Sequence, residues 1–405
     1  MNEEAFLAER FRSFYQKNPV SEPPAIEKRE FGIGEWGKKI SQRHLSFPDF
    51  QSFNGFLQQQ TPFFVSYSAA YYKEPAARPM EAKQWEGADL VFEFDADDLK
   101  TDCKLEHDSW ECTQCKSTGK GNLDACTQCG SGVKVAEWVC PECLKAVQGQ
   151  VDSLLDLLET DLGFSSGIAM NFSGSKGIHV HIRSEQAKKL SPNARIEVLD
   201  FLTGQGLDLE QLGFVERNKT LYGPPLAKAK GWQKRILQSL LQLVESNDAA
   251  RFAVAGNSSI RTAEKLLEKK ESILENIRKG IFPSSTSKPT AFWGSVLTFV
   301  SDSLKLDIDR QTSLDRFKII RVPETLHGST GLKASKLELE NWREFNALQD
   351  AVVFGDSPVK IRISKTPRFF LKNQWFGPFQ EQTEELPEFA AVFLLGRRAA
   401  TLAEK

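Results

Sequence analysis

Cysteine is absent from residues 1–102 and 144–405, so all seven cysteines of this 405-residue chain lie within residues 103–143. Histidine and methionine are also scarce, with five and three residues. An odd number of cysteines confined to one segment argues against a disulfide framework. The concentration of soft ligands in one place indicates metal binding instead.

Long apolar runs and an excess of positive charge are absent as well. No run approaches the roughly 18 residues that a membrane-spanning helix requires, so we expect no membrane association. The segment MNEEAFLAERF is acidic and lacks the basic-then-apolar pattern of a secretion signal, which predicts a cytoplasmic protein. The 52 Lys and Arg residues balance 54 Asp and Glu residues, for a formal charge of -2. This balance excludes binding to nucleic acid through overall positive charge but leaves room for a local basic groove.

The composition that remains is that of a globular protein, with 40% hydrophobic and 26% charged residues, and the length predicts two or three domains. Residue periodicity predicts helices over 3–17 and 143–161, and strands over 87–94, 167–172, 178–182, 317–322 and 359–363. Leu-rich helical periodicity with Lys and Glu faces covers 190–290, most clearly at 231–246 and 260–281. We therefore expect a helical subdomain over 191–290, inserted into an α/β core made of 1–190 and 291–405.

The cysteine-rich insert, 103–143, offers eight soft ligands, enough for two four-coordinate zinc sites. Two groupings are open. In the nested one, Cys112, Cys115, Cys126 and Cys129 form an inner site, and Cys103, His107, Cys140 and Cys143 form an outer one. In the sequential one, the first four and the last four ligands group separately. Four protein ligands leave no open coordination position, so zinc here is expected to be structural; an iron–sulfur cluster is the main competitor.

Carboxylates follow a predicted buried strand in the segment FEFDADD, at 92–98. Strand periodicity puts Asp95 and Asp97 on one side and Asp98 on the other. Two neighbouring carboxylates repel each other unless a cation lies between them, and hard oxygen ligands suit Mg²⁺ or Mn²⁺. A solvated acidic turn would have the same sequence.

A glycine-rich loop, SGSKG at 173–177, joins two predicted strands. Its glycines permit close backbone approach, while Ser173, Ser175 and Lys176 could bind phosphate. It lacks the spacing of a Walker loop. His179 and His181 share one face of the following strand, and satisfied strand histidines after a plain turn remain an alternative.

A third charged segment, 306–335, could complete such a site. It contains Asp307, Asp309 and Asp315, which could bind metal, and then Arg321, His327 and Lys333, which could face phosphate. A charged loop before a strand is the plainer interpretation of this segment alone.

Taken in order, these segments resemble the small, catalytic subunit of the archaeal and eukaryotic-type DNA primase. The resemblance runs through REFGIGEWGKKISQRHLSF, SYSAAYY, VFEFDADD, WVCPECLKAV, FSGSKGIHVH and DRQTSLDRFKIIRVPETLHGSTGL to the tail LPEFAAVFLLGRRA. It is weakest over 190–290. It implies an α/β fold with a mixed-sheet catalytic core, and synthesis of RNA primers on a single-stranded DNA template from nucleoside triphosphates. It also implies a heterodimer with a larger subunit.

The resemblance assigns roles residue by residue. Asp95 and Asp97 match the paired catalytic aspartates, and counting back from Arg321 makes Asp309 the third, so that the three would hold two Mg²⁺ or Mn²⁺ ions. Ser173 and His179 match a nucleotide-binding motif, within which Ser175 and Lys176 stand where some relatives have two basic residues. Arg43 matches a residue that contacts the triphosphate, Glu30 one near the ribose, and Arg321 and His327 complete the nucleotide-binding set. Cys140 and Cys143 match a zinc site near the catalytic pair, which favours the nested grouping.

Three other functions compete with this one. A stand-alone primase–polymerase or a repair polymerase of the same fold usually lacks a zinc insert. A non-catalytic zinc-ribbon module would have no use for three spaced aspartates and a Ser-Gly loop. An inactive scaffold explains neither feature.

Overall fold

The computed structural model describes residues 2–283 and 289–403, which divide into two compact units. The first contains Met1–Leu155, Phe164–Ile196 and Asp307–Lys405, and the second contains Asp156–Gly163 and Glu197–Leu306. The segment expected to be helical, 191–290, falls mostly in the second unit. The assignment of the first unit as a catalytic core stays a prediction.

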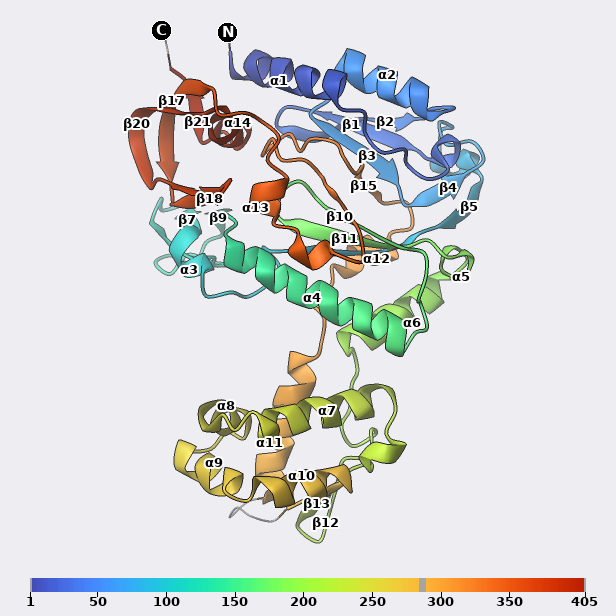
Figure 1. Cartoon of the computed structure of the whole chain (residues 1–405), viewed down its shortest axis with the longest axis vertical. Helices are drawn as coiled ribbons and strands as arrows, with labels where there is room; N and C mark the ends of the chain where they lie inside the picture. Colours follow the sequence, from blue (N-terminus) through green and yellow to red (C-terminus); the bar gives the residue numbers. More distant parts are fainter. Residues whose placement is uncertain (1, 284–288, 404–405) are drawn as a thin grey trace. The chain divides into compact units, whose positions relative to one another are not determined.

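One four-stranded sheet of the first unit has the order β15-β3-β1-β2, and its strands are β1 (Phe31–Glu35), β2 (Lys38–Leu45), β3 (Phe64–Ser68) and β15 (Ile319–Arg321). Helices α1 (Glu3–Lys17) and α2 (Phe50–Gln60) lie over this sheet (Figure 1). Leu7, Phe11 and Phe14 of α1 are buried at helical spacing, and the rings of Phe31 and Phe53 lie 4.8 Å apart between sheet and helix. The structure therefore confirms the helix that the sequence predicted over 3–17, and its buried apolar face explains why it covers the sheet.

The second four-stranded sheet has the order β16-β10-β11-β6, with β6 (Leu90–Asp95), β10 (Ile168–Phe172), β11 (Gly177–Ile182) and β16 (Lys336–Leu337). Helix α4 (Pro141–Thr160), which the sequence predicted over 143–161, runs beneath it in Figure 1. All pairings in the two sheets are antiparallel. The α/β class is confirmed. The expected mixed sheet is not found in these two sheets, whose strands are all antiparallel. Short loops join β1 to β2 and β10 to β11, and such loops allow only antiparallel pairs, because parallel pairs need long crossovers.

The strand predicted over 87–94 is in fact two strands, β5 (Trp85–Ala88) and β6, which belong to different sheets. The break falls at Asp89, whose carboxylate is completely buried against Arg29 at 3.1 Å. The apolar run concealed this break, because a buried ion pair cannot be recognised in one strand's pattern.

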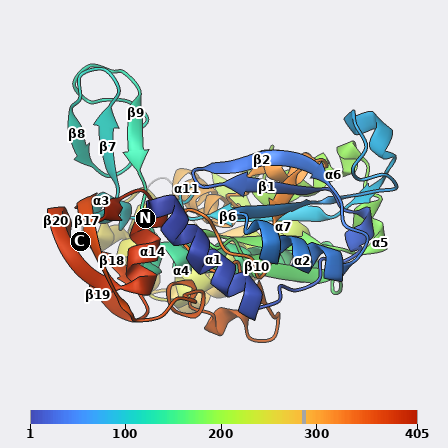
Figure 2. The ribbon, with the colours of Figure 1, turned by 90° about the horizontal axis from the view of Figure 1, so that it is seen from above.

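Two smaller parts complete the first unit. The cysteine-rich insert forms the sheet β8-β7-β9 with strands β7 (Ser109–Cys112), β8 (Thr118–Lys120) and β9 (Val133–Ala136), preceded by α3 (Lys104–His107). Figure 2 shows these three strands standing out from the rest of the unit. The C-terminal part pairs β17 (Pro358–Thr366) with β20 (Phe379–Pro387) and with β21 (Ala400–Leu402), and α14 (Glu388–Gly396) packs against them.

The second unit has its own core around Leu240 and Trp293. Its main helices are α7 (Gly231–Glu245), α8 (Ala249–Ala255), α9 (Ile260–Leu267), α10 (Lys270–Arg278) and α11 (Pro289–Ser303), beside a small sheet of β12 (Val215–Arg217), β13 (Thr220–Tyr222) and β14 (Ile281–Phe282). The helical stretch over 260–281 is therefore interrupted between Leu267 and Lys270. Nowhere in residues 2–283 and 289–403 does a helix combine the length and apolar character needed to cross a bilayer.

Candidate functional site

A pocket of about 820 Å³ is lined by residues from both four-stranded sheets of the first unit. Asp95, Glu93 and His179 come from the second sheet, and Arg43, Ser66 and Arg321 come from the first. Loops add Asp97, Ser173, Ser175, Lys176 and His327. The structure thus brings together most of the residues that the sequence singled out, although they lie far apart along the chain.

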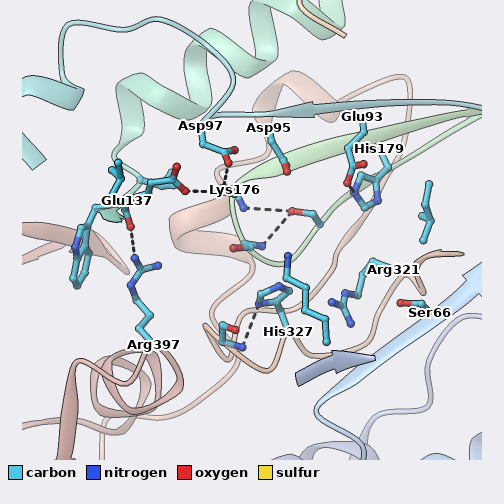
Figure 3. A pocket seen from close by; sticks show the side chains of 18 of the residues that line it. Ser66, Glu93, Asp95, Asp97, Glu137, Lys176, His179, Arg321, His327 and Arg397 are labelled. Carbon is cyan, nitrogen blue, oxygen red and sulfur yellow. Dashed lines mark hydrogen bonds and ion pairs between the residues drawn. The ribbon is translucent and has the colours of Figure 1, made fainter. Parts of the chain in front are cut away.

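A row of carboxylates enters the pocket from β6 and the turn after it. Glu93, Asp95 and Asp97 follow one another along one side, and Arg321 and His327 lie across the pocket from them (Figure 3). Strand periodicity places Glu93 and Asp95 on the same face. Antiparallel pairing sets His179 opposite Glu93 and Gly177 opposite Asp95.

The electrostatics of this row favour a cation. Burial, together with the charge of Glu93, raises the pKa of Asp95 to about 7. Asp97 Oδ1 is buried and has no hydrogen-bond partner, while its other oxygen accepts from Lys176. Buried carboxylate oxygens without donors are costly unless a cation binds them, and hard oxygens fit Mg²⁺ or Mn²⁺. The residues present therefore fit a divalent ion.

Asp309 lies beside this row but is not part of it. It caps the N-terminus of α12 (Arg310–Leu314) and, together with Asp98 and Asp307, lines a separate open depression. Thr312 Oγ1 lies within hydrogen-bond distance of both Asp309 Oδ2, at 2.5 Å, and Glu93 Oε2, at 2.9 Å, so the two carboxylates share its single O–H donor. In the described chain, the only groups with three or more candidate ligand atoms within 4.8 Å are the two Cys/His clusters. Convergence of Asp95, Asp97 and Asp309 stays a prediction.

The loop at 173–177 is shaped by its own serine and glycines. Ser173 Oγ accepts hydrogen bonds from the backbone N–H groups of Ser175, Lys176 and Gly177 at 3.1–3.3 Å. A Cβ on Gly177 would lie 1.8 Å from Asp95 Oδ1, so only glycine lets the loop pass this close to the carboxylate. The loop thereby brings Lys176 to Asp97 and Glu137, with 3.0 Å from its Nζ to the Glu137 carboxylate.

Cations and a neutral imidazole form the opposite side of the pocket. Arg321 lies over the Phe64 ring, and its Nε is buried without an acceptor. His327 Nδ1 accepts from the Ser329 backbone at 3.3 Å, which leaves Nε2 to carry the proton. Burial, and then the nearby cations, lower the pKa of His327 well below its usual value. His327 is therefore an uncharged donor in a positive field.

Arg43 forms an ion pair with Glu30, which lies outside the pocket. Glu30 is fully buried, and its Oε1 accepts from Arg43 Nε at 2.9 Å. Glu30 is not among the residues that line the pocket, whereas Arg43 is. The Glu30 carboxylate also lies 3.6 Å from the buried ammonium of Lys83. In this structure Glu30 therefore orients the Arg43 side chain and does not itself reach the pocket.

The eight soft ligands group in the nested way. The outer group is Cys103, His107, Cys140 and Cys143, and the inner group is Cys112, Cys115, Cys126 and Cys129. Sulfur–sulfur distances are 3.4 and 3.8 Å in the outer group and 3.5–3.6 Å in the inner group. A tetrahedral zinc with ~2.3 Å bonds places its sulfur ligands ~3.8 Å apart. A multi-iron cluster would spread its thiolates farther, so both groups fit a single ion such as zinc.

The outer group is connected to the pocket wall. His107 Nδ1 lies 2.8 Å from Asp108 Oδ1, which fixes the ring so that Nε2 faces Cys143. The same Asp108 oxygen accepts from the backbone N–H of Trp138, a residue of the pocket wall. The outer ligands therefore position the segment Glu137–Trp138.

Sequence reasoning missed Glu93. Its Oε1 lies 3.0 Å from His179 Nε2 and its Oε2 accepts from Thr312, so it connects β11 to α12. Burial alone would raise the pKa of Glu93, but His179, Lys318 and the Thr312 hydroxyl hold it below its usual range. The available signal was its position two residues before Asp95, on the same strand face.

The α/β fold and this pocket, with its carboxylates, glycine-rich loop and buried cations, define a class of protein whose site suits phosphate esters and divalent metal. Comparison with known families narrows the class, because the family described as DNA primase small subunit matches residues 136–338. The protein named DNA primase small subunit PriS from Methanothrix thermoacetophila is 32% identical, over 97% of each chain. Proteins of the same name from Methanocella arvoryzae and Nitrosopumilus maritimus are 27% and 26% identical, each over 98% of both chains.

This chain therefore belongs to the DNA primase small subunit family. The resemblance found in the sequence is confirmed.

Proposed function

We propose that this protein is the catalytic subunit of a DNA primase, which joins ribonucleotides on a single-stranded DNA template without a pre-existing primer. The observation that carries the proposal is the buried oxygen of Asp97 that has no hydrogen-bond partner, on a carboxylate that lines the pocket with Asp95 and whose other oxygen accepts from Lys176 of the loop at 173–177. The chemistry is a nucleotidyl transfer in which the 3′-hydroxyl attacks the α-phosphate of a nucleoside triphosphate and pyrophosphate leaves.

In this proposal Asp95, Asp97 and Asp309 hold two Mg²⁺ or Mn²⁺ ions. When bound, these ions would activate the 3′-hydroxyl and neutralise charge on the α-phosphate and pyrophosphate. Glu93 would position the carboxylates, because it shares the Thr312 hydroxyl with Asp309. Lys176 would leave Asp97 and bind the phosphate of the nucleotide, since an ammonium group is a point charge that can pair with either anion.

The remaining pocket residues would bind and orient the nucleotide. Ser173 and Ser175 present hydroxyls, Arg43 and Arg321 present guanidinium groups, and His327 donates from Nε2. His179 lines the pocket and would contact the nucleotide there. Glu93, which faces His179 Nε2, would fix the orientation of the ring. Glu30, placed near the ribose by the resemblance, would act by holding Arg43.

The two Cys/His groups would each hold one structural Zn²⁺, and the outer ion would stabilise the pocket wall at Glu137–Trp138. We also propose that the chain works with a primase large subunit, in the cytoplasm. The zinc groups favour this over a stand-alone primase–polymerase, which usually lacks them.

Changing Lys176→Ala should raise the KM for nucleotide about tenfold and change kcat less, because the lysine binds phosphate rather than the reacting atoms. Primer synthesis on oligo-dT at varied ATP concentration measures this. Lys100→Ala, an exposed lysine outside the pocket, is the matched control. A loss of template affinity with unchanged KM would show that the phosphate role is wrong.

Metal analysis of the unmodified chain should find two zinc ions. Cys126→Ser should remove one and leave primer synthesis nearly intact, since the inner group lies at the end of β7 and in the loops that join the protruding strands β7, β8 and β9. Cys143→Ser should remove the other and reduce synthesis, because the wall at Trp138 loses its support. Less than one zinc per unmodified chain would overturn both sites.

A further inference from the structure

The main pocket carries a second set of cations that the proposed nucleotide site does not use. Lys39 comes from β2, Lys365 from β17, and Arg397 and Arg398 from the turn between α14 and β21. We call these four residues the basic wall. Arg397 and Arg398 belong to the tail motif LPEFAAVFLLGRRA, for which the sequence offered no role.

The basic wall is unpaired. Within the described residues, none of its four side chains makes an ion pair with a carboxylate. Three other cations of the same pocket are paired: Lys176 with Asp97 and Glu137, Arg43 with Glu30, and Lys318 with Glu93. In a chain with a net charge of -2, four cations that line one pocket and have no ion-pair partner give it a local positive potential, which favours binding of an external anion.

Aromatic rings and backbone carbonyls hold the two arginines in place. Arg397 lies 4.2 Å from the Trp138 ring centroid and donates to the Glu137 carbonyl, while its buried Nε has no acceptor. Arg398 lies 4.8 Å from the Trp36 ring centroid and donates to the Trp36 carbonyl. These contacts fix the guanidinium groups without neutralising them.

The wall also contributes to the field within the pocket. After burial, the causes that lower the pKa of His327 are the charges of Arg321, Lys39, Arg397 and Lys176. Lys39 and Arg397 of the basic wall therefore act electrostatically on His327, as Arg321 and Lys176 of the proposed nucleotide site do. An anion bound at the wall would lie next to the nucleotide.

We propose that the basic wall binds the phosphodiester backbone of a nucleic-acid strand, adjacent to the nucleotide site. This rests on the proposed function and adds to it a place for the strand. The four cations come from three separate elements, with no glycine-rich loop among them, so they suit successive phosphates better than one compact triphosphate. Contacts of this kind read no base, so recognition is independent of sequence.

Fluorescence anisotropy of labelled oligo-dT and oligo-U with the full chain, over a series of salt concentrations, tests the proposal. Lys39→Ala combined with Lys365→Ala should weaken binding on the order of tenfold at low salt. It should also reduce the slope of log K against log salt by about 1.4, because each neutralised phosphate of a single strand contributes ~0.7 to that slope. Equal losses on both oligonucleotides indicate a shared track, and a loss on one alone assigns the wall to the template or to the primer.

The matched control is Lys360→Ala with Arg362→Ala, which removes two charges from exposed positions of β17 outside the pocket. This control should keep the unmodified slope. An equal slope change in both double variants, or no measurable binding by the unmodified chain, overturns the proposal. So does a raised nucleotide KM with unchanged oligonucleotide binding. An unmodified chain that binds with the expected slope but makes no primer would instead defeat the proposed function.

Discussion

Asp97→Ala will lower primer synthesis by on the order of a thousandfold or more, while the chain stays folded. Asp97 supplies the one carboxylate oxygen of the row that is buried without any donor. Alanine removes this oxygen together with the charge that faces Lys176, so the pocket loses its affinity for the cation. Labelled ATP, oligo-dT and Mn²⁺ provide the assay, with protein and metal concentrations matched.

Asp302→Ala serves as the control for Asp97→Ala, because Asp302 is a surface carboxylate of the second unit and pairs with Lys305. It should leave synthesis unchanged. Circular dichroism checks that both variants are folded. Normal primer yield from Asp97→Ala would remove Asp97 from the catalytic set.

Asp89→Ala should destabilise the first unit by about 3–5 kcal/mol, the cost expected when one partner of a buried ion pair is removed. The Asp89 carboxylate lies 3.1 Å from Arg29, whose side chain is completely buried, and accepts from the Tyr71 hydroxyl at 2.7 Å. Alanine would leave the Arg29 guanidinium buried without a counter-charge. Urea denaturation followed by fluorescence measures the loss in the free energy of unfolding.

Glu86→Ala is the matched comparison for Asp89→Ala, because Glu86 pairs with Lys28 at the surface, where such a pair contributes below about 1 kcal/mol. Equal losses from the two variants would contradict the role given to Asp89. Burial would raise the pKa of Asp89, but His181 and Arg29 hold it well below its usual range. Its stabilisation is therefore complete above the unfolded pKa of about 3.9 and is lost as pH falls further.

The sequence predicted those parts of the fold that depend on local periodicity. Helices α1 and α4 and strands β10 and β11 lie within about two residues of the predicted ranges. The break at Asp89 could not be predicted, because it depends on a buried partner sixty residues away, Arg29. The antiparallel pairing was also missed, since strand order depends on contacts between segments distant in sequence.

The candidate site was likewise predictable only where its residues form local motifs. Asp95, Asp97 and the loop at 173–177 are adjacent because Gly177 pairs with Asp95, and their motifs could be recognised separately. Glu93 was missed because one carboxylate within a strand has no motif of its own. The basic wall was missed because its residues, from position 39 to 398, come together only in the folded chain.

Anomalous diffraction from crystals of the full chain with Mn²⁺ and a non-hydrolysable ATP analogue will show whether Asp95, Asp97 and Asp309 bind the same metal ions. Manganese should be bound to oxygens of both Asp95 and Asp97, at roughly 2.0–2.3 Å, with an oxygen of Asp309 also bound. Manganese elsewhere, with Asp97 still paired to Lys176 beside the bound nucleotide, would contradict this prediction.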